Sequence, residues 1–356
     1  MELAPNLLNY GSVNPVLVTG HTGFKGTRLA LLLRTLGIPA IGLALPPAPE
    51  SLYTRIPNLS LEAEYFEDIR DYSAVSRIIN AHNPSVIFHL AAQPLVIESY
   101  RTPRETFETN VMGTANLLEA FRKSKNALLF AGVTTDKVYK NLESARKFQE
   151  DDSLAGKDPY SASKVGTESA LAAWRQISSV NDGPQVLSLR AGNVIGGGDF
   201  ASDRIIPDIV RGLQSGEAIQ IRNPKSTRPW QHVLDPIRGY LMASEFALTK
   251  GGINEFNFGP DGDSLSVNQL INEAMSVWER STPEIRYETG NTNLEAVTLQ
   301  LDSNLSKEIL NWKPLWSQEQ AIRDTFAWWS SVLHKDISAE EACLQDISKA
   351  SNQKRS

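Results

Sequence analysis

The chain of 356 residues is poor in cysteine and histidine, and this limits the kinds of site that it can form. Cys343 is the only cysteine, which excludes an intramolecular disulfide and favours a reducing compartment, so we expect a cytoplasmic location. The five histidines are scattered and show no spacing typical of zinc ligands, so we expect no metal site.

The sequence also lacks long apolar runs and an excess of positive charge. Because no run of about 18 apolar residues occurs, no membrane span is predicted. Residues 1–11 lack the basic and apolar regions of a signal peptide. A composition with 41% hydrophobic and 21% charged residues is typical of a soluble globular protein. The formal net charge of -6 argues against a nucleic-acid partner.

A glycine-rich turn near the N-terminus is the first strong signal. The apolar residues 16–19 predict a strand, and the apolar run 29–33 predicts a helix that stops at Gly37. Between them lies the sequence GHTGFKG, residues 20–26. Glycines at such a turn let backbone amides approach a pyrophosphate, which then lies at the positive end of the helix. The pattern therefore predicts a dinucleotide site, although its spacing is Gly-x-x-Gly-x-x-Gly.

The second signal is the pair Tyr160 and Lys164. The two residues are four positions apart in a segment that we predict to be helical, so their side chains share one face. A lysine ammonium beside a phenol lowers the pKa of the phenol. A tyrosine tuned in this way takes a hydroxyl proton near neutral pH. The pair alone is common on helix faces, and it gains meaning from the glycine turn in the same chain.

Further strands alternate with helical segments along the first half of the chain. Residues 39–45, 86–90, 127–133 and 185–190 read as strands, and the run at 86–90 is apolar throughout, as in a buried parallel strand. The alternation predicts an α/β fold with a Rossmann-type, doubly wound parallel sheet. The strand over 39–45 ends without the Asp or Glu that often binds the adenosine ribose, which leaves the choice between NAD and NADP open.

The alternation loosens in the second half of the chain, which suggests two domains. We predict an NAD-binding domain over residues 1–192 and a smaller, mainly substrate-binding C-terminal domain over 193–337. Residues 228–258 are expected to return to the first domain. The last residues, 338–356, are predicted to form a polar, frayed tail.

Five motifs resemble the extended short-chain dehydrogenase/reductase family, and within it the dehydratases that act on sugar nucleotides. The resemblance runs from about residue 16 to about residue 329. Lys137 stands where other sugar-nucleotide dehydratases usually carry Glu. The motifs are GHTGFKG at 20–26, HLAAQPLV at 89–96, TDK at 135–137, RAGNVIGGGD at 190–199 and RPWQHVL at 228–234.

The resemblance implies NAD as a cofactor that is reduced and then regenerated in place. The residues that it implies as cofactor contacts are Gly20, Thr22, Gly23, Phe24, Lys25, Gly26, Asp68, Ile69, Leu90, Ala91, Ala92, Asn110, Tyr160 and Lys164.

The resemblance also implies the catalytic roles. Tyr160, assisted by Lys164, takes the proton from the hydroxyl on sugar carbon 4, and Thr135 bonds the reacting oxygen. Asp136 is the expected acid for loss of the hydroxyl on carbon 6, and Lys137 the expected base at carbon 5. A lysine base needs a lowered pKa, so Lys137 is alternatively expected to position Asp136 or to stabilise the enolate.

The implied substrate is CDP-glucose, and this specificity rests on resemblance alone. Arginine suits the diphosphate because its planar fork binds two oxygens at once. The residues expected to contact the substrate are Gln93, Asn193, Arg204, Arg222 and Arg228.

Alternatives remain open at this point. A sugar-nucleotide 4-epimerase shares Tyr160, Lys164 and the glycine turn but needs no acid, so Asp136 favours a dehydratase. A dinucleotide-binding protein without chemistry need not keep Thr135 with Tyr160 and Lys164. The apolar spacing over 104–123 predicts a helix. Its apolar face is expected to pack either across the interface of a homodimer or higher homo-oligomer, as the family implies, or within one subunit.

Overall fold

The computed structural model describes Asn9 and residues 14–141, 146–221, 223–280, 283–287 and 299–352. Seven parallel strands form one sheet in the order β11-β6-β5-β4-β1-β2-β3. The first strand lies inside the sheet and later strands add on both sides, which confirms the predicted doubly wound, Rossmann-type fold. The strands are β1 Val16–Thr19, β2 Ala40–Ala44, β3 Ala63–Phe66, β4 Val86–His89, β5 Leu129–Thr135, β6 Gln185–Ala191 and β11 Glu255–Phe258.

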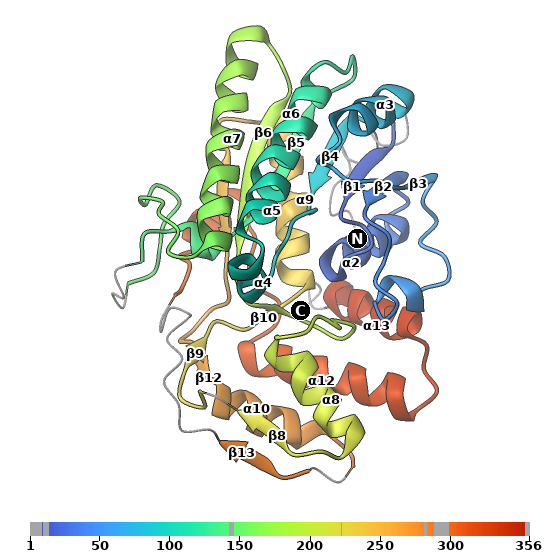
Figure 1. Cartoon of the computed structure of the whole chain (residues 1–356), viewed down its shortest axis with the longest axis vertical. Coiled ribbons are helices and arrows are strands. Elements are labelled where there is room, and N and C mark those ends of the chain that lie inside the picture. The colour runs from blue at the N-terminus through green and yellow to red at the C-terminus, as the bar shows by residue number, and fades with distance from the viewer. Residues whose placement is uncertain are drawn as a thin grey trace.

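Helices cover both faces of this sheet (Figure 1). Val16 and Val18 of β1 belong to the core that includes α2 (Phe24–Thr35) and α9 (Leu234–Thr249). Leu17 belongs to the core on the other face, which is formed with α3, α6 and α7. Because successive strand residues point to opposite faces, strands covered on both sides are apolar throughout. The three helices are α3 Tyr72–His82, α6 Thr114–Arg122 and α7 Pro159–Asn181.

The helix predicted over 104–123 is interrupted. It consists of α5 (Pro103–Phe107), a wider π-helical turn over Glu108–Gly113, and α6. Asn110 lies in the wide turn, and its carbonyl accepts hydrogen bonds from the hydroxyls of Thr114 and Thr167, each at 2.7 Å. Such turns are a local departure from α-helical bonding and are frequent near functional sites.

The second half of the chain adds a group of short elements below the carboxyl ends of the strands (Figure 1). One continuous core runs from the sheet through this group, so the two predicted domains share their packing. The remaining elements are α4 Val96–Arg101, β7 Val194–Ile195, α8 Ile205–Ser215, β8 Ile219–Ile221, β9 Thr227–Arg228, β10 Gln231–His232, β12 Leu265–Ser266, α10 Val267–Val277, β13 Ile285–Tyr287, α11 Asn304–Leu310 and α12 Gln318–His334.

The prediction of a polar, frayed tail from residue 338 on is wrong for most of this segment. Residues 339–352 form helix α13 (Ala339–Asn352), which buries Cys343 and Ile347. Asp346 of this helix pairs with the fully buried Arg28 of α2 at 2.9 Å. The segment looks polar because one of its buried positions is a charged partner for Arg28, which a count of apolar residues does not reveal.

Replacing Asp346 by Asn should destabilise the protein strongly. The change leaves the buried Arg28 guanidinium without its counter-charge, and breaking such a pair costs about 3 kcal/mol of unfolding free energy. Asp261→Asn is the matched control, because Asp261 pairs with Lys307 on the surface. There we expect a loss of less than about 1 kcal/mol. Denaturant titration of both variants tests this, and equal losses would contradict a structural role for α13.

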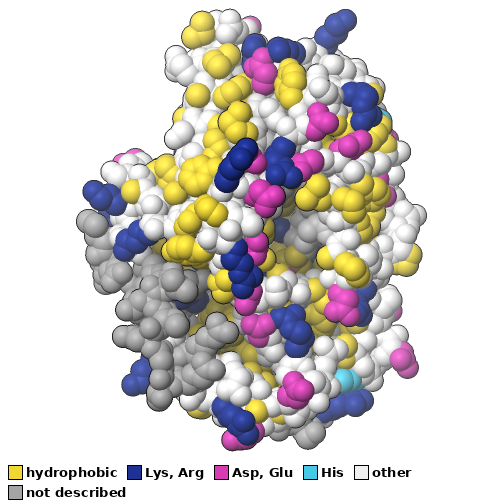
Figure 2. Space-filling view, viewed as in Figure 1, with side chains coloured by type: hydrophobic (Ala, Val, Ile, Leu, Met, Phe, Trp, Pro, Cys, Tyr) yellow, Lys and Arg dark blue, Asp and Glu magenta, His cyan; other side chains and the backbone are white. Residues whose placement is uncertain are grey.

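Three features of the described residues bear on possible partners: the charge of the surface, helices that could span a membrane, and clusters of metal ligands. Acidic and basic side chains are intermixed on the face seen in Figure 2. No helix within the described ranges has the length and apolar character needed to cross a bilayer. Over the same ranges, no three His, Cys, Asp or Glu side chains gather as metal ligands do.

Candidate active site

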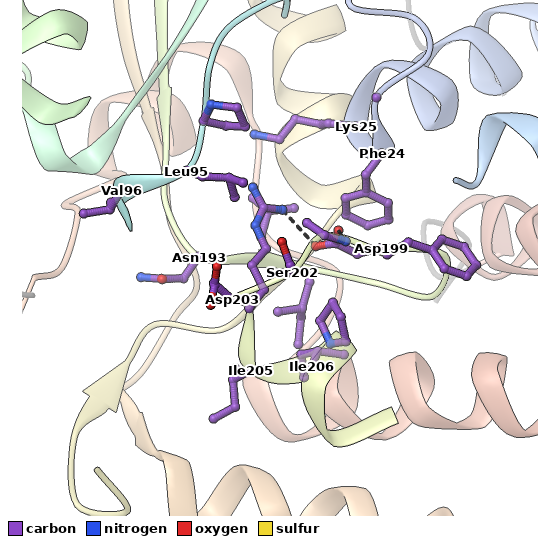
Figure 3. Close-up of a pocket in the computed structure, with 18 of the residues that line it drawn as sticks. Phe24, Lys25, Leu95, Val96, Asn193, Asp199, Ser202, Asp203, Ile205 and Ile206 are labelled. Carbon is purple, nitrogen blue, oxygen red and sulfur yellow. Dashed lines mark hydrogen bonds and ion pairs between the residues drawn. The ribbon is translucent and has the colours of Figure 1, made fainter. Parts of the chain in front are cut away.

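A cavity of about 2270 Å³ lies at the carboxyl ends of the sheet strands, where open parallel sheets bind ligands. Its walls come from the glycine turn before α2, the ends of β4, β5 and β6, the start of α7, and the segment from 192 to 228. Phe24 and Lys25 lie across this space from Ser202 and Asp203 (Figure 3). The volume is large enough for two nucleotide-sized ligands side by side.

The glycine turn forms the wall at the start of α2. An added Cβ at Gly26 would lie 2.0 Å from the Gly20 carbonyl oxygen, so only glycine fits where the helix packs onto the turn. Gly23 precedes the helix without a side-chain cap, and the first turn carries no acidic residue. The positive end of α2 therefore faces the cavity without a competing carboxylate, as a pyrophosphate requires.

Thr135 and Asp136 follow directly at the end of β5. Asp136 is 1% exposed, and its Oδ1 accepts a hydrogen bond from Thr135 Oγ1 at 2.9 Å. Its Oδ2 has no hydrogen-bond partner among the described residues. A Cβ at Gly192 would lie 1.9 Å from Oδ2, so glycine at this position makes room for the carboxyl group.

Burial raises the pKa of Asp136, while the positive charge of Lys137 and the hydrogen bond from Thr135 oppose the rise. Arg228 also acts on Asp136, which places a predicted substrate contact near the predicted acid. A buried carboxyl group with a raised pKa and a free oxygen is suited to donate a proton.

Tyr160 and Lys164 lie in the first turns of α7, as the sequence predicted. Asp158 caps this helix by accepting from Ser161 N at 2.9 Å, and Pro159 occupies its first position, so the start of the helix is fixed. Both side chains reach the cavity wall.

The expectation that Lys164 lowers the pKa of Tyr160 is wrong for the protein without ligands. Burial raises the pKa of the Tyr160 phenol to about 12, against a hydrogen bond from Thr135. The Lys164 ammonium instead donates to the Val133 carbonyl at 3.2 Å, and burial lowers the pKa of Lys164 to about 8. Loss of hydration around the phenol outweighs the effect of a lysine whose donor is directed at the backbone.

Lys25 is a further cation in the cavity. Burial lowers the pKa of its ammonium to about 7, and the positive charges of Arg204 and Lys164 add to the effect. Its Nζ lies 3.3 Å from the Tyr240 hydroxyl of α9. The lysine of the glycine turn thus titrates near neutral pH.

Arg204 enters the cavity from the loop that follows the glycines at 196–198. It forms an ion pair with the buried Asp199 at 2.8 Å, which is the dashed contact at Asp199 in Figure 3. The positive charge of Arg204 acts on both Lys25 and Tyr160. This predicted substrate contact is therefore close to the reaction site.

Most of the predicted site residues line the cavity. Gln93 and Asn110 do not, because Gln93 N donates to Asn110 Oδ1 at 2.8 Å and the pair is turned to the helix behind the wall. Arg222 lies outside the described residues. The residues in the wall are Gly20, Thr22, Gly23, Phe24, Lys25, Gly26, Asp68, Ile69, Leu90, Ala91, Ala92, Thr135, Asp136, Lys137, Tyr160, Lys164, Asn193, Arg204 and Arg228.

Some residues of the wall were not predicted. Phe200, Ser202 and Asp203 belong to the loop after the three glycines at 196–198. Glu50 and Ser51 also line the cavity, although they lie several residues beyond the end of β2 at Ala44, where the ribose-binding acid was sought. The course of the loops in the folded chain brings these residues to the cavity, and no local sequence pattern marks them.

Comparison with known proteins agrees with this geometry. The sequence model of the GDP-mannose 4,6 dehydratase family matches residues 17–325. The protein named CDP-glucose 4,6-dehydratase from Salmonella typhimurium is 38% identical, over 90% of this chain and 91% of that protein.

Two solved structures share the fold. The UDP-glucose-4-epimerase of Stenotrophomonas maltophila with bound NAD and formylated UDP-arabinopyranose has a TM-score of 0.79 at 20% identity, and covers 91% of this chain and 100% of that one. The dTDP-glucose 4,6-dehydratase of Bacillus anthracis in complex with NAD has a TM-score of 0.74 at 21% identity, with 91% and 98% covered. The family match and the relative from Salmonella typhimurium show that the chain belongs to the GDP-mannose 4,6 dehydratase family of extended short-chain dehydrogenases/reductases.

Proposed function

We propose that this chain is an NAD-dependent lyase that converts CDP-glucose into CDP-4-keto-6-deoxyglucose and water. The observation that carries the proposal is the buried Asp136 beside Thr135, at the strand end that Tyr160 also faces. A 4-epimerase needs the tyrosine but no buried acid. Incubation with CDP-glucose and NAD tests the proposal, because a 4-keto-6-deoxy product supports it and a 4-epimer or unchanged substrate contradicts it.

The residues present fit NAD. Gly26 lets α2 pack closely onto the glycine turn, and the first turn of α2 carries no carboxylate, so the positive end of the helix suits the pyrophosphate; Asp68 and Ile69 line the cavity for the adenine. When bound, NAD supplies a positively charged nicotinamide that accepts a hydride from carbon 4 and returns it to carbon 6.

Different side chains of the site carry out the different proton transfers. With the positive charge of bound NAD favouring its phenolate, Tyr160 Oη takes the proton of the hydroxyl on carbon 4, while Thr135 Oγ1 turns its hydrogen from Asp136 to the same oxygen. Asp136 donates a proton to the hydroxyl that leaves carbon 6. Lys137, half-buried beside it, removes the proton on carbon 5, or alternatively holds Asp136 and the enolate in place. Arg204 and Arg228 hold the diphosphate.

Further parts of the proposal concern the assembly and setting of the protein. Large apolar side chains are exposed on α4, α5, the wide turn and α7, where Figure 2 shows hydrophobic side chains together, and we propose this surface as a homodimer interface. We also propose that residues 193–337 mainly bind the substrate. The enzyme would act in the cytoplasm and provide deoxysugars for O-antigen. The exposed apolar residues of the proposed dimer interface are Tyr100, Phe107, Met112, Ile177 and Val180.

The proposed substrate leads to a prediction about the nucleotide. The kcat/KM for CDP-glucose should exceed that for dTDP-, UDP- and GDP-glucose by at least about tenfold, since a site built to hydrogen-bond one base leaves polar groups unpaired with another. Equal or higher kcat/KM with another nucleotide would overturn the CDP assignment and leave the reaction type standing.

The missing acid at the end of β2 leads to a prediction about the cofactor. With no carboxylate directly at the end of β2 to bind the ribose hydroxyls, the protein should be purified partly empty, and added NAD should raise its activity. Titrating NAD and NADP into stripped protein checks this. Full activity of the stripped protein, or recovery with NADP only, would contradict the proposal.

A further inference from the structure

A second cluster of charged side chains lies behind the reaction site, between α7, β5 and β6. Glu168 of α7 is 6% exposed, and Arg190 of β6 donates to its carboxylate at 2.9 and 3.0 Å. Thr134 donates to it at 2.5 Å and Ser188 at 2.7 Å. Both carboxylate oxygens are thus bonded, and the side chain is fixed between the helix and two strands.

Glu168 and Lys164 lie one helical turn apart and reach neighbouring residues of β5. Lys164 Nζ donates to the Val133 carbonyl at 3.2 Å, and the Thr134 hydroxyl donates to Glu168 at 2.5 Å. The next residue of the strand is Thr135. Two oppositely charged side chains of α7 therefore hold the strand end that carries the reacting hydroxyl.

The charge balance around Lys164 depends on Glu168. Burial lowers the pKa of Lys164 to about 8, and the negative charge of Glu168 opposes this. From α2, Lys25 adds a positive charge. From β4, the buried His89 faces the same space with a pKa of about 3, so it is neutral at pH 7.

Glu168 itself stays ionised in this setting. Burial works against its charge, but the hydrogen bonds and charge of Arg190 outweigh burial and lower the pKa of Glu168. Its carboxylate is therefore available as a fixed negative charge at the pH where Lys164 titrates.

We infer that Glu168 is a positioning residue: its negative charge stabilises the Lys164 ammonium one turn away, and its bond to Thr134 fixes the end of β5, so that Lys164 and Thr135 face the substrate together. It touches neither substrate nor cofactor and acts through Lys164 and Thr134. Its importance for turnover rests on the proposed function, whereas its effect on Lys164 does not.

The direct test measures the titration of Lys164 in the protein without ligands, by competitive acetylation at a series of pH values and mass spectrometry. In the unmodified protein Lys164 should titrate near pH 8. In Glu168→Gln the titration should move to lower pH by about one unit, because an opposite charge nearby is removed. Glu168→Asp, which keeps the charge, should restore most of the original value.

Two further variants make the outcome decisive. Glu255→Gln is the matched control, because Glu255 of β11 pairs with Arg175, which lies about three helical turns beyond Lys164 on α7; it should leave the titration unchanged. Should Glu168→Gln fail to fold, Glu168→Gln combined with Arg190→Gln removes both buried charges and should show a downward shift that is smaller, because a positive charge is removed as well.

A folded Glu168→Gln variant in which Lys164 titrates as in the unmodified protein would overturn the inference, even with lower turnover. A shift in Lys164 together with no turnover of CDP-glucose by the unmodified protein would leave the inference standing and refute the proposed function instead.

Discussion

Replacing Tyr160 by phenylalanine should reduce turnover by about 10²- to 10⁴-fold, the usual contribution of a general base. The change removes one oxygen at a position buried in the wall of the cavity, next to Thr135. The reaction should stop before oxidation, so no absorbance of reduced nicotinamide should appear when substrate is mixed with NAD-loaded protein.

Tyr72→Phe is a suitable control, because Tyr72 lies on the surface of α3 and bonds Lys123. It should turn over at the normal rate. Normal oxidation by Tyr160→Phe would mean that another group takes the proton. Lys25 would then become the first candidate to examine, because burial lowers its pKa to about 7 and its neutral amine could accept a proton.

Replacing Asp136 by Asn should stop a different step. The amide keeps the size of the side chain but cannot donate a carboxyl proton, so oxidation should survive while loss of water slows by about 10²- to 10⁴-fold. Reduced nicotinamide should therefore accumulate in a single turnover. Asp261→Asn, an exposed aspartate paired with Lys307, serves as the control and should behave normally.

The pH dependence of the elimination step should change in the same variant. Burial raises the pKa of Asp136, so the acid form persists to higher pH than for an ordinary aspartate, and elimination should slow as pH rises through that pKa. This limb of the profile should be absent from Asp136→Asn. An unaltered limb would assign the acid to another residue.

The sequence was informative where the signal is local and repeated. Strands covered on both faces must be apolar throughout, so β4 and β5 were predicted close to their observed bounds. The glycine turn and the spacing of Tyr160 and Lys164 are likewise local, and parallel topology brings them to one edge of the sheet.

The sequence was misleading where tertiary burial decides the property. Helix α13 reads as polar because the partner of Asp346 is Arg28, 318 positions away. The pKa of Tyr160 rises because of burial that no spacing encodes, and Asp136 has room only because Gly192 lies against it. The wide turn at Glu108–Gly113 depends on hydroxyls that reach the Asn110 carbonyl, including one from α7.

Following a deuterium label from carbon 4 of CDP-glucose tests the central claim most directly. A dehydratase with internal return of the hydride should yield product that carries the label at carbon 6 of the same molecule, with one solvent hydrogen at carbon 5. Mixing labelled and unlabelled substrate shows whether the transfer stays within one molecule. Label that returns to carbon 4 with inverted configuration would identify an epimerase and contradict the role of Asp136 as the acid.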